Sequence, residues 1–270
     1  MRPADRHQQI LDMVNQQGNI TVDALCEKFH TSPETIRRDL GQLSATGKLR
    51  KVHGGATRAS SVGEGPFYQR FRRNVEAKRT IAKLAASLIS PGDALFVDTG
   101  TTTLVFAEEI AKINGLTVVS NSVDIIRILD QGSGEDKSLH LLGGRYHGIN
   151  GETLGNVAIS QLEKFRPHYA VVAVGAIDAE AGLTDYDEGE ADLAAAMLGI
   201  ACSNIILTDS SKFESIGGYH VAPLANVDRL VTDIPASGLL HDRLLDNNVE
   251  LVHPVSVDSK GIIQRESANA

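Results

Sequence analysis

The sequence has little cysteine and no long apolar run. Its two cysteines, Cys26 and Cys202, lie far apart and outside any CxxC motif or Cys/His cluster. This argues against a zinc site and favours a reducing cytoplasm. No stretch approaches the roughly 18 apolar residues of a membrane span, and the first nine residues contain no apolar signal core. We therefore expect neither secretion nor insertion into a membrane.

Two kinds of chemical motif are also missing. None of the nine histidines pairs with another ligand at the spacing of a metal motif. No GKT or GKS follows the glycine-containing loops, so the sequence gives no support for nucleotide hydrolysis. We expect neither a metal nor a cofactor.

Charge is distributed unevenly along the 270 residues. Residues 1–79 contain 14 Lys+Arg and 8 Asp+Glu, a balance of +6, whereas residues 80–270 contain 12 and 26, a balance of −14. A basic surface attracts phosphates, so one end of the chain is suited to a polyanion. On charge alone, a solvated surface of mixed charge explains the difference equally well.

The basic end has the pattern of three short helices. Apolar spacing predicts a helix over 6–16, a second from a cap at Thr21 to about His30, and a third capped by Ser32 with Pro33 in its first position. The second and third, separated by a tight turn, match a helix-turn-helix, whose last helix enters the major groove. Residues 49–56 then predict a β-hairpin wing with a basic strand and a Gly-Gly turn.

The expected DNA contacts lie on the third helix and the wing. Side chains near the start of the third helix can reach base edges, and its arginines can contact phosphates or guanine. The wing is placed to contact the sugar-phosphate backbone or the minor groove. The set is Ser32, Glu34, Thr35, Arg37, Arg38, Arg50, Lys51 and His53. Each cation alone is better explained as a solvated surface charge. Together on one candidate face they favour DNA binding.

A linker is expected after the wing. Residues 57–66 are small, polar and contain Gly and Pro, and three aromatics then stand beside Arg70, Arg72 and Arg73. Docking of this aromatic segment on one of the domains is favoured over stacking on nucleic acid. The expected divisions are a winged helix-turn-helix domain over 1–57, a linker over 58–76, a sensor domain over 77–254 and a partly disordered tail over 255–270.

The acidic end alternates between short apolar runs and amphipathic helices. The runs fall at 94–97, 116–119, 139–142, 169–174, 204–207, 229–232 and 249–252. Continuous apolar runs are typical of strands buried on both faces. The sequence therefore predicts an α/β domain with a mostly parallel sheet.

Four polar segments follow these runs, where ligands of such sheets collect. Residues 98–103 open a helix with a glycine followed by three consecutive threonines, which suits a phosphate or is simply a helix cap. Residues 120–122 follow the next run, and Arg145 after Gly143-Gly144 is either an anion clamp or a surface arginine. Asp187 and Glu190, with 209–212, either bind sugar hydroxyls and move protons or form surface ion pairs.

Taken together, these motifs resemble one family. The run Ser32-Pro33-Glu34-Thr35-Ile36-Arg37-Arg38-Asp39-Leu40, closed by His53-Gly54-Gly55-Ala56, resembles the N-terminal signature of the DeoR family of bacterial transcription regulators. The likeness continues through Asp98–Thr102, Asn121-Ser122, Gly143-Gly144, Gly175, Glu190 and Asp209–Phe213, and covers about residues 6–252. It implies a winged helix-turn-helix joined to a sensor domain similar to ribose-5-phosphate isomerase, in an oligomeric repressor released from its operator by a phosphorylated sugar or related metabolite.

The resemblance also implies an effector site. Asp98, Thr99, Gly100, Thr101 and Thr102 would form the phosphate-facing loop, and Asn121, Gly144, Arg145, Glu190 and Lys212 would line the rest of the pocket. One departure concerns residues 191–197, where many relatives carry basic residues and this chain has Ala-Asp-Leu-Ala-Ala-Ala-Met. This departure puts the usual effector chemistry in doubt on that side.

We therefore expect a cytoplasmic DNA-binding repressor of a carbohydrate-catabolism operon. Its partners would be double-stranded operator DNA, a sugar-phosphate effector and further copies of itself in a dimer or tetramer, with no membrane. One alternative is a sugar-phosphate isomerase-like enzyme with an appended DNA-binding domain, using Glu190 or Asp187 as base and Lys212 as charge stabiliser. Another is a DNA-binding protein with a vestigial pocket that acts only through oligomerisation.

Overall fold

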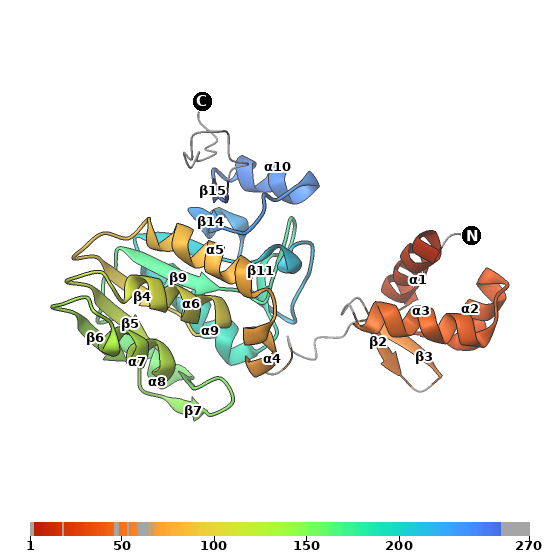
Figure 1. Ribbon diagram of the computed structural model, residues 1–270, viewed down its shortest axis with the longest axis horizontal. Helices are drawn as coiled ribbons and strands as arrows, with labels where there is room; N and C mark the ends of the chain where they lie inside the picture. The colour runs from red at the N-terminus through yellow and green to blue at the C-terminus, as the bar shows by residue number, and fades with distance from the viewer. Residues whose placement is uncertain are drawn as a thin grey trace. The chain divides into compact units, whose positions relative to one another are not determined.

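The computed structural model describes residues 3–17, 19–45, 49–52, 54–58, 65 and 67–254. The chain divides into two compact units, Met1–Val62 and Gly63–Ala270 (Figure 1). The expected tail, 255–270, lies outside the described residues. In the described part of the chain, no helix combines the length and apolar character needed to cross a membrane.

The smaller unit is a winged helix-turn-helix. Its elements are α1 (Pro3–Gln17), β1 (Asn19–Thr21), α2 (Val22–Phe29), α3 (Pro33–Ala45), β2 (Leu49–Val52) and β3 (Gly55–Arg58). The strands form an antiparallel sheet in the order β1-β3-β2. The predicted helices and hairpin are confirmed, whereas β1 was not foreseen because three residues are too few for a periodic pattern.

Local chemistry sets the turn between α2 and α3. Thr21 caps α2 by accepting a hydrogen bond from the Ala24 amide at 3.2 Å, and the Ser32 hydroxyl accepts one from the Thr35 amide at 3.3 Å. Between the two helices His30 takes the left-handed conformation, with φ 49°, which ends α2. The position of α3 therefore follows from short-range signals in the sequence.

Packing then fixes the three helices against one another. Their buried side chains are Ile10, Val14, Leu25, Ile36, Leu40 and Leu43. Asp39, which is only 4% exposed, accepts a 2.6 Å hydrogen bond from Arg6 and contacts His7 at 2.9 Å. The hydrogen bonds and charge of Arg6 and His7 hold the pKa of Asp39 below its usual range although burial opposes this. These contacts tie α1 to the back of α3.

The larger unit is built on a seven-stranded parallel sheet. Its strands are β4 (Ala94–Val97), β5 (Thr117–Ser120), β6 (Ser138–Leu141), β9 (Tyr169–Ala173), β12 (Ser203–Leu207), β14 (Arg229–Val231) and β15 (Glu250–Val252), in the order β15-β14-β12-β9-β4-β5-β6. Each corresponds to one of the seven apolar runs. The predicted α/β fold with a mostly parallel sheet is confirmed, and every pairing within this sheet is parallel.

Further elements surround this sheet. The helices are α4 (Phe67–Arg72), α5 (Val75–Ala86), α6 (Thr101–Ile110), α7 (Val123–Gln131), α8 (Asn156–Leu162), α9 (Glu188–Ile200) and α10 (Gly238–Asp246), with short 3-10 helices η1 (Ser210–Lys212) and η2 (Leu224–Asn226). β7 (Arg145–His147) and β8 (Glu152–Leu154) form a hairpin. β10 (Ala176–Asp178), β11 (Gly182–Asp185) and β13 (Tyr219–Ala222) form a small antiparallel sheet. The sequence did not predict α4, α10, the hairpin or the small sheet.

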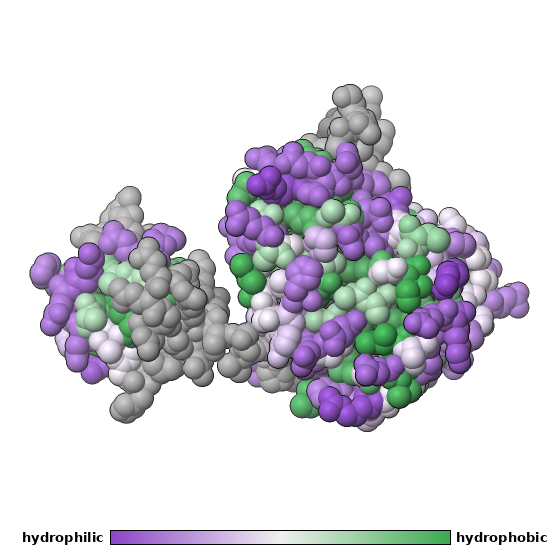
Figure 2. All heavy atoms as spheres, turned by 180° about the vertical axis from the view of Figure 1, so that it is seen from behind, coloured by the Kyte–Doolittle hydropathy of each residue, from purple (hydrophilic) through white to green (hydrophobic). Residues whose placement is uncertain are grey.

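Helices cover both faces of the parallel sheet. Within β4, Leu95 and Val97 belong to the core on the face covered by α5, α6 and α7, whereas Phe96 belongs to the core on the opposite face, which includes side chains of α8, α9 and α10. Such a three-layer arrangement buries successive residues of a strand on opposite faces, which explains the continuous apolar runs. Outside the cores, hydrophobic residues form separate patches with hydrophilic residues between them on the face of the larger unit seen in Figure 2.

Candidate ligand pocket and DNA-contacting surface

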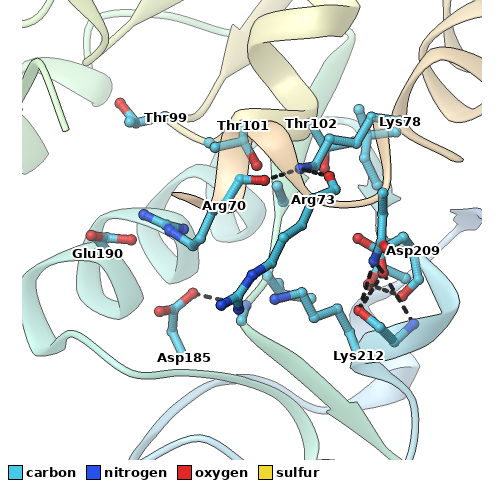
Figure 3. Close-up of a pocket in the computed structure, with 18 residues that line it drawn as sticks. Arg70, Arg73, Lys78, Thr99, Thr101, Thr102, Asp185, Glu190, Asp209 and Lys212 are labelled. Atoms are coloured by element: carbon cyan, nitrogen blue, oxygen red, sulfur yellow. Dashed lines mark hydrogen bonds between the residues drawn. The ribbon is translucent and has the colours of Figure 1, made fainter. Parts of the chain in front are cut away.

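A pocket opens at the carboxyl edge of the parallel sheet, within the larger unit. The loops after β4, β9 and β12, three neighbouring strands, form its floor, and the corner between α4 and α5 forms one side (Figure 3). Its volume is about 660 Å³, including solvent at the mouth. This is the edge at which ligands of parallel α/β sheets bind.

The loop after β4 is built for an anion. Thr99, Gly100, Thr101 and Thr102 line the pocket. The N-cap of α6 is Gly100, which has no side chain to bond the first amide groups, and these groups and the helix dipole favour negative charge. A Cβ at Gly100 would lie 3.0 Å from the Thr103 hydroxyl and 3.1 Å from the Ala173 methyl. The Thr99 hydroxyl is buried, and among the described residues it has no hydrogen-bond partner. A ligand oxygen here would satisfy it.

Four cationic side chains surround this loop. They are Arg70 at the end of α4, Arg73, Lys78 on α5 and Lys212 on η1. Burial lowers the pKa of Lys212 to about 8. Burial also lowers the pKa of Lys78 to about 8, where the charges of the two arginines add to it and that of Asp209 opposes it. These positive charges lie where solvation is poor, so they attract a bound anion more strongly than they would in water.

The corner between α4 and α5 is tied to the pocket by its own side chains. Lys78 donates hydrogen bonds to the backbone carbonyls of Arg70 and Arg73, the second at 2.7 Å. Asn74 takes the left-handed conformation with φ 50°, and its amide donates to the Asp209 carboxylate at 3.0 Å and to the Ser211 hydroxyl at 3.2 Å. These bonds hold the two arginines at the pocket.

Carboxyl groups occupy the opposite side. The side chains of Arg70 and Glu190 point toward each other (Figure 3). Burial, together with the charges of Glu152 and Asp185, raises the pKa of Glu190 to about 9, although Arg70 opposes the shift. Asp185, whose pKa burial also raises, accepts a 3.0 Å hydrogen bond from the Gly175 amide. These shifts favour the protonated form of Glu190, which can both donate to and accept from a ligand hydroxyl.

The structure brings six of the ten expected effector residues into the pocket. Thr99, Gly100, Thr101, Thr102, Glu190 and Lys212 line it. Asp98 and Asn121 lie directly behind the loop, where both accept a hydrogen bond from the Thr99 amide, at 2.7 Å and 3.0 Å. Burial and the charge of Glu152 raise the pKa of Asp98 well above its usual value. These two residues support the loop rather than face its opening.

Gly144 and Arg145 are not among the residues that line the pocket. Arg145 is exposed at the start of β7. Gly144 has φ 150°, and a Cβ there would lie 2.7 Å from the Leu154 carbonyl oxygen, so its place is set by the close approach of β8.

Sequence reasoning missed the part of the pocket that precedes the sheet. Arg70, Arg73, Asn74 and Lys78 all line it. The arginines beside aromatics were noticed, and docking of that segment was favoured, which agrees with the contact between α4 and α6. Nothing in the sequence showed that the segment would reach the carboxyl edge of the sheet.

Among the expected DNA contacts, those of α3 lie on its exposed side. Ser32, Glu34, Arg37 and Arg38 are exposed and Thr35 is half-buried. Glu34 and Arg37 are 3.9 Å apart, a weak exposed ion pair. Arg50 and Lys51 lie on β2, but their side chains are outside the described part, and His53 lies outside the described residues.

A winged helix-turn-helix joined to an α/β unit with such a pocket defines a DNA-binding regulator with a small-molecule effector. The sequence comparisons agree: the DeoR-like helix-turn-helix domain matches residues 6–62, and the DeoR C terminal sensor domain matches residues 73–234. The chain belongs to the DeoR family of transcription regulators.

Its curated relatives include transcriptional repressors. The chain is 31% identical to the HTH-type transcriptional repressor CsqR of Escherichia coli over 92% of its own length and 95% of the relative's. It is 29% identical to the glycerol-3-phosphate regulon repressor of the same species over 93% and 99% of the two chains. The chain is thus a regulator rather than the sugar-phosphate isomerase considered as the alternative.

One solved structure aligns with about half of this chain. Ribose 5-phosphate isomerase A from Methanocaldococcus jannaschii aligns with a TM-score of 0.38 and 16% identity, over 52% of this chain and 55% of that one.

Proposed function

We propose that the protein represses a carbohydrate-catabolism operon and leaves its operator when a phosphorylated sugar or polyol enters the pocket. The observation that carries the proposal is that four cationic side chains and the N-terminus of α6 line the same pocket. Its relative's regulon is named after glycerol 3-phosphate, a small phosphate ester, which supports this class of effector.

The charge of the pocket matches this ligand. Arg70, Arg73, Lys78 and Lys212 face Asp185 and Asp209, while Glu190 is neutral at pH 7. A phosphate monoester carries about two negative charges at this pH. Its arrival would balance the excess of cations, and the neutral Glu190 is suited to a hydroxyl of the same ligand.

The connection between the two units begins at the pocket. The expected linker, 58–76, includes α4, and Arg70, Arg73 and Asn74 in it line the site. A phosphate that draws the two arginines inward changes the segment that leads to the DNA-binding unit. The effector then acts through its different affinity for the two arrangements of the chain, by about 1–3 kcal/mol.

The remaining parts of the proposal concern the assembly. We propose that two or more protomers, working in the cytoplasm, place α3 in successive major grooves of a repeated or palindromic operator. The DNA contacts proposed are Ser32, Glu34, Thr35, Arg37 and Arg38, with Arg50, Lys51 and His53 on the wing.

One experiment tests the proposal. Genomic DNA fragments are selected for binding to the full-length protein, and the tightest is titrated in a gel-shift assay with sn-glycerol 3-phosphate, glucose 6-phosphate and fructose 6-phosphate. We expect at least one ester to release the DNA and to raise the unfolding temperature, and the unphosphorylated counterparts to do neither. If none of the esters does either, the effector part of the proposal is refuted, and release by an unphosphorylated sugar would also contradict it.

A further inference from the structure

The turn of the β7–β8 hairpin places Asn150 behind the pocket. Its side-chain amide donates to the Glu190 carboxyl at 2.7 Å and to the Glu152 carboxyl at 2.9 Å. Asn150 does not line the pocket, whereas Glu190 does. One amide thus holds together two carboxyl groups from different elements, β8 and α9.

The hydrogen bonds continue from Glu152 to the anion loop. Glu152 and Asn121 are fully buried, and the Asn121 amide donates to the Glu152 carboxyl at 3.3 Å. The side-chain oxygen Oδ1 of Asn121 accepts a hydrogen bond from the Thr99 backbone amide at 3.0 Å. A chain of side chains therefore runs behind the pocket from the loop after β4 to the start of α9.

Backbone bonds anchor the hairpin to the same place. The Val123 amide donates to the Gly151 carbonyl, and the Thr153 amide donates to the Asn121 carbonyl, both at 2.9 Å. Asn150 therefore stands at a fixed distance from the end of β5. Glu190, in contrast, is in the first turn of α9, which Asp187 caps, so α9 alone leaves the rotamer of Glu190 open.

We propose that Asn150 is a positioning residue that decides which phosphates the pocket accepts, because it holds the Glu190 carboxyl at a set place relative to the anion loop. The inference rests on the proposed function and deepens it: the pocket selects phosphate esters that carry a hydroxyl within reach of Glu190 over phosphate alone. Burial raises the pKa of both Glu152 and Glu190, and a protonated carboxyl suits a neutral hydroxyl.

The test compares two affinities in the full-length protein. Calorimetry gives the Kd for inorganic phosphate and for the tightest of sn-glycerol 3-phosphate, glucose 6-phosphate and fructose 6-phosphate. In Asn150→Ala we expect the ester to bind about tenfold more weakly and inorganic phosphate to change by less than twofold. Asn247→Ala, which removes an asparagine at the end of α10, should change neither. An equal loss of both ligands in Asn150→Ala would show a structural role and overturn the proposal.

A double-mutant cycle separates positioning from other effects. In a Glu190→Ala background, Asn150→Ala should cause no further loss of ester affinity, because the group it positions is gone. Additive losses would refute the proposal. Asn150→Leu serves if the alanine variant unfolds at lower temperature: it keeps about the same size, has no hydrogen-bond donor, and should show the same loss of selectivity. Failure of wild type to bind any of these phosphates would refute the proposed function itself, whereas unchanged selectivity in both variants would refute the role of Asn150 alone.

Discussion

Raising the pH from 7 to 9 should weaken binding of a phosphate ester about tenfold, because Lys212 loses its proton in this range. Its pKa is about 8 in the folded protein. Such a lysine is about 90% protonated at pH 7 and about 10% at pH 9, whereas an exposed lysine would remain charged. If the ligand needs the charged form, the Kd rises about tenfold, as the protonated fraction falls. This corresponds to a loss of about 1.4 kcal/mol of binding free energy. The ester itself is already ionised above about pH 7.

The measurement is calorimetric titration with sn-glycerol 3-phosphate, or with the tighter ester of the panel, at pH 7, 8 and 9 and constant ionic strength. Lys78, whose pKa is also about 8, and Glu190, whose pKa is about 9, titrate in the same range and can add to the decline. In the variant Lys212→Arg the side chain stays charged up to pH 9. Its Kd should therefore rise about tenfold less between pH 7 and pH 9 than the Kd of the wild type. A Kd for the wild type that is equal at pH 7 and pH 9 would refute the reasoning.

The deprotonation of Lys212 does not itself destabilise the folded protein. The folded pKa of Lys212 is lowered from 10.5 to about 8, so between these values the unfolded chain binds more protons than the folded one. The contribution of this lysine to stability therefore increases as the pH rises through that window. A thermal unfolding curve at each pH checks this directly. Weaker binding without a lower unfolding temperature assigns the effect to the pocket.

Three further predictions concern substitutions in the DNA-binding helix, the pocket and the wing. Arg38→Ala should weaken binding of the selected DNA by about 1–3 kcal/mol in a gel shift without lowering the unfolding temperature, and equal binding would remove Arg38 from the contacts. Thr101→Ala combined with Lys212→Ala should abolish release of the DNA by the ester and leave DNA binding unchanged. Normal release in this variant would show that the effector binds elsewhere. Gly55→Ala places a Cβ 2.1 Å from a β1 carbonyl and should destabilise the wing by about 1–3 kcal/mol in thermal unfolding. Gly41→Ala, with open space around it, should stabilise α3 slightly, and equal effects of the two would contradict the argument.

The sequence determined the elements whose signals are local. Seven apolar runs gave the seven parallel strands because both faces of that sheet are covered, and the caps Thr21 and Ser32 marked the starts of α2 and α3. The anion loop was visible because a glycine and four threonines lie within the six residues after β4. Such features depend on neighbouring residues, so periodicity and capping rules reach them.

Tertiary structure decided which side chains share the pocket. Arg70, Arg73 and Lys78 precede the sheet in the chain, and only the packing of α4 and α5 on the larger unit brings them to its carboxyl edge. Asn150 belongs to a hairpin too short to show a periodic pattern, yet it binds a carboxyl of α9 forty residues away. The pKa values of Lys212 and Glu190 likewise depend on burial, which a linear pattern does not contain.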